Sequence, residues 1–478
     1  MKKSAVTAGV VVLAAAAYTG VSWYVGVQTE KTIRAALERA NARIVKTLGP
    51  DLGTLGVRID ISEYRRGLFS TDARYTFVVQ EDDERIELGM ADHMQHGPFP
   101  WALAKQGSFT PLLAYSRSQL VDTETVKRWF DAARGAMPLE IDTRIRFGGD
   151  GDSVWAFAPL EWALDDDRLS FSGGQMRVSF SNEFRDSESE GAFASFLIGD
   201  GAGGDTIALK DIVLRSRSAT AADETVQMHS TLEAASLVVR DMTDEAVTAE
   251  QVRVTLDSTQ RGALLDAALR YDFDRVRVGE IDLGSVTVGG ELARFDYEAF
   301  SALMAEYDAI ADEHGADEGE DFQLTPEDEA RLFAKVLPAL ASSPQVSLRP
   351  VEWRNEKGES TLAVTAAFQP VAGSGEAQHD DLLAQALREL RIELVLSRPM
   401  FIQAFAQTGG DESERQQLEM LAAMLFDQYV GNLEGEGLVR REGDQAQVTI
   451  VYGNGAVDVN GQSMSLDEFL LLFAGFMM

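Results

Sequence analysis

The chain has 478 residues, with 43 lysines and arginines against 77 aspartates and glutamates, and a formal net charge of −34. A surface this acidic repels phosphate backbones, so we expect no nucleic-acid partner. The absence of cysteine excludes disulfides, thiolate metal sites and cysteine nucleophiles. The chain is 45% apolar, which is enough to bury a sizeable core in more than one domain.

An apolar run without charged residues occupies residues 5–27. The hydrocarbon core of a bilayer takes about 20 apolar residues in a helix, so the run predicts a transmembrane signal-anchor. Lys2 and Lys3 precede it and would stay in the cytoplasm, while Trp23 and Tyr24 would lie at the far membrane interface. The bulk of the chain is then translocated.

A cleaved signal peptide is the alternative to an anchor, because Ala14–Ala17 offers small residues to a peptidase. We favour the anchor, since apolar side chains continue from there to Val27. Residues 28–48 follow with an apolar stripe at helical spacing, and they predict a stalk helix that leaves the membrane.

Short runs that alternate apolar and polar residues dominate from residue 57 onward. The clearest are 175–184, 361–368, 391–397 and 447–453. Alternation with a period of two predicts strands with one buried and one solvated face, which is typical of antiparallel sheet. Residues 273–292 indicate consecutive strands with glycine at the corners.

Helices are predicted between these strands, at 122–137, 296–311, 325–340 and 411–430, and from Ser465 to the C-terminus. Thr325 is the expected N-cap of the third, and Ser465 precedes Glu468 by the spacing of a capping box. The last helix is too short to span a bilayer, and we expect it to dock on the sheet. The predicted fold is α+β: extended, curved antiparallel β-sheets with helices packed on one face, plus one N-terminal transmembrane helix.

The predicted domain organisation follows from these elements and from one acidic run that has almost no large apolar side chains. It comprises residues 1–4 as a cytoplasmic N-terminus, 5–27 as the transmembrane signal-anchor, 28–48 as the stalk helix, 49–311 as a periplasmic β-rich region, 312–323 as an acidic linker and 324–478 as a C-terminal α+β region.

Several motifs of enzymes and cofactor sites can be tested against this pattern. Gly199–Gly204 reads G-x-G-x-x-G, but dinucleotide binding needs a helix after that loop, and the following residues alternate like a strand. The acidic stretches 148–153 and 165–167 favour turns over calcium sites. The chain has no P-loop, nucleophile elbow or H-E-x-x-H motif. We therefore predict no cofactor and a non-enzymatic role.

The stretch "DHMQHGPFPW", Asp92–Trp101, is the strongest candidate for chemistry. His93 and His96 are spaced by three and could share one face of a helix, with Asp92 orienting an imidazole. A catalytic zinc ion needs three protein ligands, and the other histidines are distant in sequence. A cryptic metal-dependent hydrolase at these three residues is kept as an alternative.

The prolines in this stretch favour a structural interpretation. Pro98 and Pro100 end any helix and bias the residues before them toward extended backbone. We expect a stiff turn in which Phe99 and Trp101 pack against the sheet and the histidine is hydrogen-bonded. The residues assigned to this structural turn are His96, Gly97, Pro98, Phe99 and Pro100.

Four stretches together resemble the YdgA-like family of bacterial inner-membrane-anchored periplasmic proteins, a domain of unknown function. They are "YRRGLFST" at 64–71, "HGPFP" at 96–100 followed by "SFTPLLAYSRS", "GGQMRVSFS" at 173–181 and "GLVRREGDQAQVTIVYGNGAVDVNGQSM" at 437–464. The resemblance spans nearly the whole chain. It implies a single anchor in the bacterial inner membrane with the bulk in the periplasm, and it supplies no catalytic residues.

The anchor, the long β pattern and the lack of catalytic motifs favour a non-enzymatic envelope protein. A curved sheet covered by apolar helices can cradle a hydrophobic ligand such as a lipid or acyl chain. The alternative is a scaffold or assembly partner in a cell-envelope complex. Expected partners are the inner membrane, a lipid or envelope protein, and a second copy in a homo-oligomer.

Overall fold

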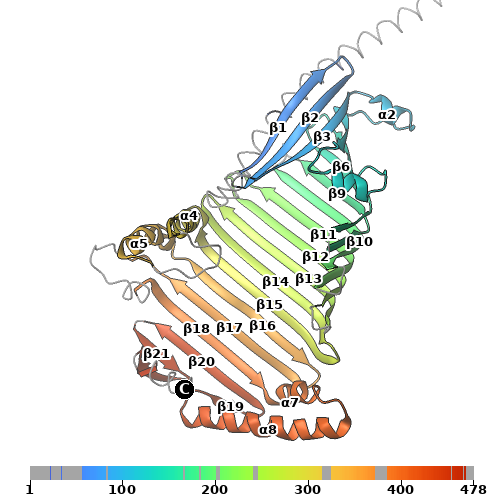
Figure 1. Cartoon of the computed structure of the whole chain (residues 1–478). Helices are drawn as coiled ribbons and strands as arrows, with labels where there is room; N and C mark the ends of the chain where they lie inside the picture. The colour runs from blue at the N-terminus through green and yellow to red at the C-terminus, as the bar shows by residue number, and fades with distance from the viewer. Residues whose placement is uncertain are drawn as a thin grey trace, which may run out of the picture. The chain divides into compact units, whose positions relative to one another are not determined.

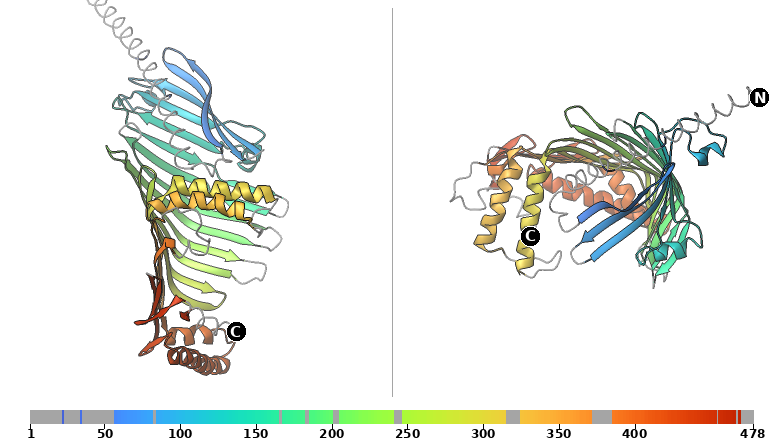
Figure 2. Two further views of the ribbon diagram at one scale, coloured as in Figure 1. Left: turned by 90° about the vertical axis from the view of Figure 1, so that its left-hand side faces the viewer. Right: turned by 90° about the horizontal axis from the view of Figure 1, so that it is seen from above.

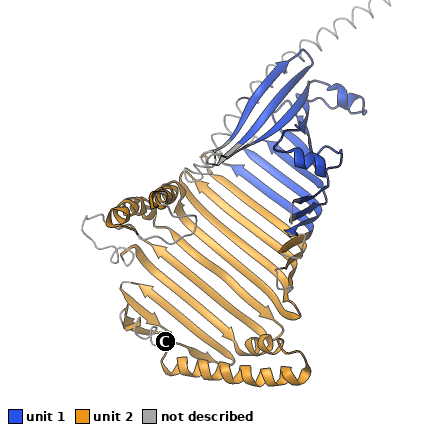
Figure 3. Ribbon diagram, in the orientation of Figure 1, with its two compact units in different colours: residues 1–202, 210–220 blue, residues 203–209, 221–478 orange. Residues whose placement is uncertain are grey.

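The computed structural model of the chain describes twelve segments (Figure 1). They are residues 22, 34, 56–81, 84–164, 167–181, 185–200, 205–240, 246–314, 324–371, 385–453, 455–466 and 468–469. The chain divides into two compact units, coloured separately in Figure 3. Unit 1 comprises residues 1–202 and 210–220, and unit 2 comprises residues 203–209 and 221–478.

Unit 1 is built around an antiparallel sheet. Its strands are β1 (Gly56–Arg66), β2 (Ser70–Glu81), β3 (Glu84–His96), β4 (Ala114–Leu120), β5 (Leu139–Ile145), β6 (Gly151–Phe157), β7 (Leu160–Leu164), β8 (Asp167–Phe171), β9 (Gly174–Ser181), β10 (Asp186–Asp200) and most of β11 (Thr206–Thr220). From β1 to β6 each strand pairs with the next one in sequence, and β6 then pairs with β9. Strand β10 pairs first with β9 and then with β8.

Two short helices belong to this unit, α2 (Trp101–Ala104) and α3 (Lys127–Ala132). The residue that precedes α3, Val126, is buried in an apolar cluster with Met90 and Leu120 of the sheet. A second cluster on the same sheet includes Met94, Ile145 and Phe180. One face of unit 1 therefore carries a packed core.

Unit 2 is a longer antiparallel meander. Its strands are β12 (Val226–Arg240), β13 (Ala246–Arg261), β14 (Leu264–Val278), β15 (Ile281–Asp296), β16 (Gln345–Asn355), β17 (Gly358–Phe368), β18 (Leu387–Ser397), β19 (Arg440–Glu442), β20 (Gln445–Gly453), β21 (Ala456–Val459) and β22 (Gln462–Ser465). Each strand from β12 to β18 pairs with the next, and β18 then pairs with β20. The sheet is open and curved (Figure 1).

Two helical hairpins are inserted into this meander, and both stand on the same side of the unit 2 sheet (Figure 2). They are α4 (Tyr297–His314) with α5 (Pro326–Ala341), between β15 and β16, and α7 (Arg398–Ala406) with α8 (Glu412–Gly435), between β18 and β19. Phe426 and Val430 of α8 pack against Ala446 and Val448 of β20. The two hairpins lie at opposite ends of the antiparallel strands, because α4 follows the end of β15 and α7 follows the end of β18.

Helix α5 begins with the capping box expected from the sequence. The Thr325 hydroxyl accepts from the Asp328 amide, and the Asp328 carboxylate accepts from the Thr325 amide and hydroxyl. His314, at the end of α4, lies 2.9 Å from the same carboxylate. These bonds hold the pKa of Asp328 down, at about 2.

We predict that the α4–α5 hairpin loosens in acid. The native pKa of Asp328 is lower than that of an unfolded aspartate, so the stabilisation is complete above about pH 4 and is lost as the pH falls toward about 2. Asp328→Asn should speed amide exchange in α5 at neutral pH, as measured by hydrogen exchange with mass spectrometry. Asp308→Asn, on the exposed side of α4, is the control. Equal exchange in both variants would contradict the assignment.

The sheet architecture agrees with the prediction of extended, curved antiparallel sheet with helices. The anchor (5–27) and the stalk (28–48) lie outside the described residues apart from Ser22 and Arg34, and within the described chain no helix is long and apolar enough to span a membrane. Helix α4 continues through residues 312–314, the start of the predicted linker, and 315–323 lie outside the described residues.

Candidate functional site

The histidine-containing stretch forms a strand that ends at His96. The strand conformation directs its polar side chains to opposite faces of the sheet, because successive side chains of β3 alternate between them. Asp92 and His96 are 4% and 1% exposed, whereas His93 lies on the other face and pairs with exposed Asp72, 2.7 Å away. The two histidines therefore do not share the face of a helix, and Asp92 and His93 lie on opposite faces of β3.

Asp92 is the most deeply buried carboxyl group of this unit among the described residues. The hydroxyls of Ser116 and Ser118 on β4 both donate to its Oδ1, the second at 2.9 Å. Tyr75 on β2 also forms a hydrogen bond with it. Burial raises the pKa of Asp92 despite the two serine hydroxyls, which act in the opposite direction.

His96 is hydrogen-bonded into the turn, as expected. Its Nε2 lies 2.8 Å from the Thr71 hydroxyl and its Nδ1 lies 3.3 Å from the Leu68 carbonyl. Burial lowers the pKa of the imidazole. The expectation that Phe99 and Trp101 pack against the sheet is wrong, because these side chains are 40% and 66% exposed.

The turn itself is closed by backbone hydrogen bonds. The Gly97 amide donates to Leu113, and the Leu112 amide donates to Pro98. The Gly97 carbonyl accepts from the hydroxyl of Ser22 at 2.6 Å, and Ser22 is fully buried. This bond joins Ser22, a residue of the apolar run, to the turn.

No metal site is formed at these residues. Across the described segments, no group of three histidine, cysteine, aspartate or glutamate side chains is placed to hold a metal ion. Lys2, Lys3, Trp23 and Tyr24, the predicted membrane anchor residues, lie outside the described residues.

The unit 2 sheet carries a continuous apolar face, which extends over more strands than any other feature of the described residues. The cross-strand register places apolar residues opposite one another from strand to strand: Leu232 faces Val254, Val254 faces Tyr271, and Tyr271 faces Val288. The row continues through Val351, Leu362, Leu394 and Val448. Two parallel rows are formed by Leu256, Leu269, Leu348, Val364, Ile392 and Ile450, and by Ala234, Val252, Phe273, Val286 and Trp353.

We call this set of rows the apolar face. Several side chains on and beside it keep considerable access to solvent, including Tyr271, Val346 and Leu348 at 38%, 41% and 43% exposed. Both helical hairpins are on the same side, since Phe300 of α4 packs on Phe295 with ring centroids 4.8 Å apart. Contiguous exposed apolar surface is a common feature of interaction sites in proteins, so this face is the candidate site.

The opposite face of the same strands is polar and carries ion pairs. Arg253 pairs with Glu233 at 2.9 Å and Arg349 pairs with Glu291 at 2.9 Å. Exposed pairs of this kind contribute little to stability, but they keep that face solvated. The two faces of the unit 2 sheet therefore differ sharply in character.

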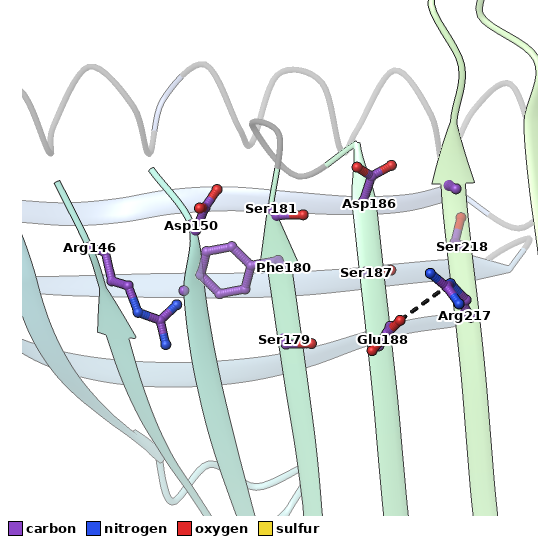
Figure 4. Close-up of a pocket in the computed structure, with 12 residues that line it drawn as sticks. Arg146, Asp150, Ser179, Phe180, Ser181, Asp186, Ser187, Glu188, Arg217 and Ser218 are labelled. Carbon is purple, nitrogen blue, oxygen red and sulfur yellow. Dashed lines mark ion pairs between the residues drawn. The ribbon is translucent and has the colours of Figure 1, made fainter. Parts of the chain in front are cut away.

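Two polar cavities are the alternatives to the apolar face. One, of about 470 Å³ in unit 1, is lined by Phe180 and by serine and charged side chains, and its Arg217 pairs with Glu188 at 3.2 Å (Figure 4). The other, of about 570 Å³ in unit 2, holds the ion pair of Arg275 with Asp282. The two arginines named here are each paired with a carboxylate of the same cavity.

The fold and the site define a class: an open antiparallel sheet protein with one apolar and one polar face. The chain belongs to the family described as "Bacterial protein of unknown function (DUF945)", whose model matches residues 1–467. This agrees with the family resemblance seen in the four sequence stretches.

Relatives in the same family cover the whole length. The chain is 26% identical to Protein YdgA of Escherichia coli strain K12, over 99% of this chain and 97% of the relative. It is 23% identical to the uncharacterized protein YihF of the same organism, over 98% of each chain. An uncharacterized protein of Haemophilus influenzae matches 36% of this chain. No solved structure matches.

Proposed function

We propose that this protein is a membrane-anchored, non-enzymatic protein of the bacterial envelope that binds the hydrocarbon part of a lipid on the apolar face of unit 2. The observation that carries the proposal is the partial exposure of that face over successive paired strands. Each large apolar side chain gains about 1.5–3 kcal/mol on full burial, and an acyl chain can supply the missing cover.

The dimensions of the face suit an acyl chain. Strands lie about 4.8 Å apart, so the path from β12 to β20 across the meander is about 34 Å. Half of a bilayer core, which is the depth of one leaflet, is about 15 Å. A single chain laid across the strands would thus contact several of them, with the α7–α8 hairpin closing one end.

A charge placed on the apolar face is predicted to abolish lipid binding. Leu348→Glu puts a carboxylate among Val364 and its neighbours, which repels hydrocarbon, while the 43% exposure of Leu348 lets the carboxylate reach water and the sheet fold. We expect several-fold less lipid to co-purify with the full chain, as measured by organic extraction and mass spectrometry.

The matched control is Thr365→Glu on the same pair of strands. Thr365 faces Arg391 on the polar side, so the new carboxylate lies beside the ion pair of Arg391 with Glu393 and leaves the apolar face intact. Wild type and control should carry equal lipid. Absence of lipid from the wild-type protein, or equal lipid in both glutamate variants, would refute the proposal.

A scaffold role in an envelope complex is the second candidate, and helix α8 favours it. Its outer side exposes Met420, Met424 and Tyr429 at 69%, 57% and 68%. Cross-linking in native membranes distinguishes the two functions, because a scaffold yields a defined protein adduct at α8 whether or not lipid is bound.

A further inference from the structure

A second exposed apolar surface lies at one end of the unit 1 sheet. Three connections reach this end: the β1–β2 turn, the β3–β4 connection with α2, and the β5–β6 turn. Their exposed side chains are Leu68, Phe69, Phe99, Trp101, Phe109 and Phe147, which are 40–67% accessible to solvent. We call these six residues the aromatic rim.

Backbone hydrogen bonds hold the three connections side by side. The His96 amide donates to the Phe69 carbonyl at 2.8 Å, and the Leu113 amide donates to the Ile145 carbonyl at 2.8 Å. At about 4.8 Å per strand, the first and last turns are about 19 Å apart. The rim is therefore one surface on a rigid sheet.

The connections that form the rim are poor in acidic residues, unlike the chain as a whole. Aspartate and glutamate make up 77 of 478 residues, about one in six, yet residues 93–121 contain none. Residues 64–71 and 143–149 contain none either, and they carry exposed Arg65, Arg66 and Arg146, of which Arg65 pairs with Glu63 and Arg146 with Asp152 just outside these stretches. Lys105 adds a cation 5.6 Å from the centre of the Trp101 ring.

The position of the rim indicates what covers it. Ser22 donates to the carbonyl of Gly97, within the β3–β4 connection, and Ser22 is near the end of the apolar run 5–27. A rim of aromatic side chains with basic neighbours is the composition that favours the interface of a bilayer with anionic head groups. The bond from Ser22, a residue of the predicted anchor, favours the bilayer over a protein partner as the occupant of this surface.

We infer that the aromatic rim of unit 1 is a second membrane contact, which inserts its aromatic side chains among the head groups of the bilayer that holds the anchor. The rim fixes the end of the unit 1 sheet against the membrane, whereas an anchor alone would leave the unit free to tilt. This inference rests on the proposed membrane anchoring and is independent of lipid binding in unit 2.

The absence of cysteine allows a direct test with single thiols in the full chain. Phe109→Cys and Phe147→Cys place an NBD fluorophore on two different connections of the rim. Glu124→Cys places it at an exposed position in the β4–β5 connection, at the other end of the same strands. The labelled proteins are reconstituted into phosphatidylglycerol-containing vesicles, with and without bromine on the acyl chains.

We expect blue-shifted emission from the label in Phe109→Cys and in Phe147→Cys, with several-fold quenching by brominated lipid, and neither effect in Glu124→Cys. Flotation of the vesicles reports anchoring separately. If the protein floats with the vesicles while both rim labels remain in water, the inference is overturned and the proposed anchor still stands. If the rim labels are shielded equally in detergent, and unlabelled Phe109→Cys forms disulfide-linked dimers when oxidised with copper phenanthroline, a second copy covers the rim. That result would also overturn the inference.

Discussion

Gly97→Ala is expected to destabilise unit 1 by about 3 kcal/mol or more, because an added methyl group has no room in this turn. A Cβ at position 97 would lie 1.8 Å from the carbonyl oxygen of Leu112 and 3.1 Å from that of Leu113. Both atoms belong to the backbone, which cannot move aside as a flexible side chain would. The Gly97 amide also donates to Leu113, so a shift of the turn breaks that bond.

Thermal unfolding of the full-length protein in detergent, followed by circular dichroism, measures this loss. Gly148→Ala in the β5–β6 turn is the matched control, since its nearest contact is a side-chain oxygen of Asp150 at 3.9 Å. It should change stability by no more than about 0.5 kcal/mol. A Gly97→Ala protein that melts with the wild type would show that the turn is not closed in this way.

The strands of unit 2 were predictable from sequence because their two faces differ. Residues 361–368, 391–397 and 447–453 alternate apolar and polar side chains over most of their length, and they lie in β17, β18 and β20. The segment after Gly199–Gly204 is also a strand, β11, so dinucleotide binding loses its structural basis. The order of the strands could be expected too, since short connections favour pairing between neighbours.

The apolar face could be predicted only in part. Alternation shows that each strand has an apolar side, but a packed core and an open binding face give the same pattern in sequence. What decides between them is whether another layer covers the sheet. The exposure of Tyr271 and Leu348 shows that no layer of the described residues covers this part of the sheet. That exposure depends on where the two helical hairpins are inserted.

The spacing of His93 and His96 was compatible with a helix, and that interpretation missed the burial of Asp92 on a strand. The correct period was visible: Leu88, Met90, Asp92, Met94 and His96 alternate with other residues and share one side of β3. An aspartate in such a row predicts a buried carboxyl group. Its partners on β4, by contrast, follow from the register, which no local pattern specifies.

Asp92→Asn is expected to stabilise the protein at neutral pH and to flatten its dependence on pH. Burial raises the pKa of Asp92 above that of an unfolded aspartate, near 3.9, so the native state holds the proton more tightly. The contribution of Asp92 to the free energy of unfolding is then fully favourable below about pH 4, and it is lost as the pH rises through the native pKa. Asparagine stays neutral and still accepts from Ser116 and Ser118.

The gap in melting temperature between Asp92→Asn and wild type should therefore widen from about pH 4 to about pH 8. Asp92→Ala separates charge from hydrogen bonding: it leaves the two serine hydroxyls without their acceptor and should be about 2–3 kcal/mol less stable than Asp92→Asn at either pH. Asp72→Asn removes the exposed partner of His93 on the other face, and its difference in melting temperature from wild type should not widen with pH. If Asp92→Asn were less stable than wild type at pH 8, the ionised carboxylate would itself be holding β2, β3 and β4 together.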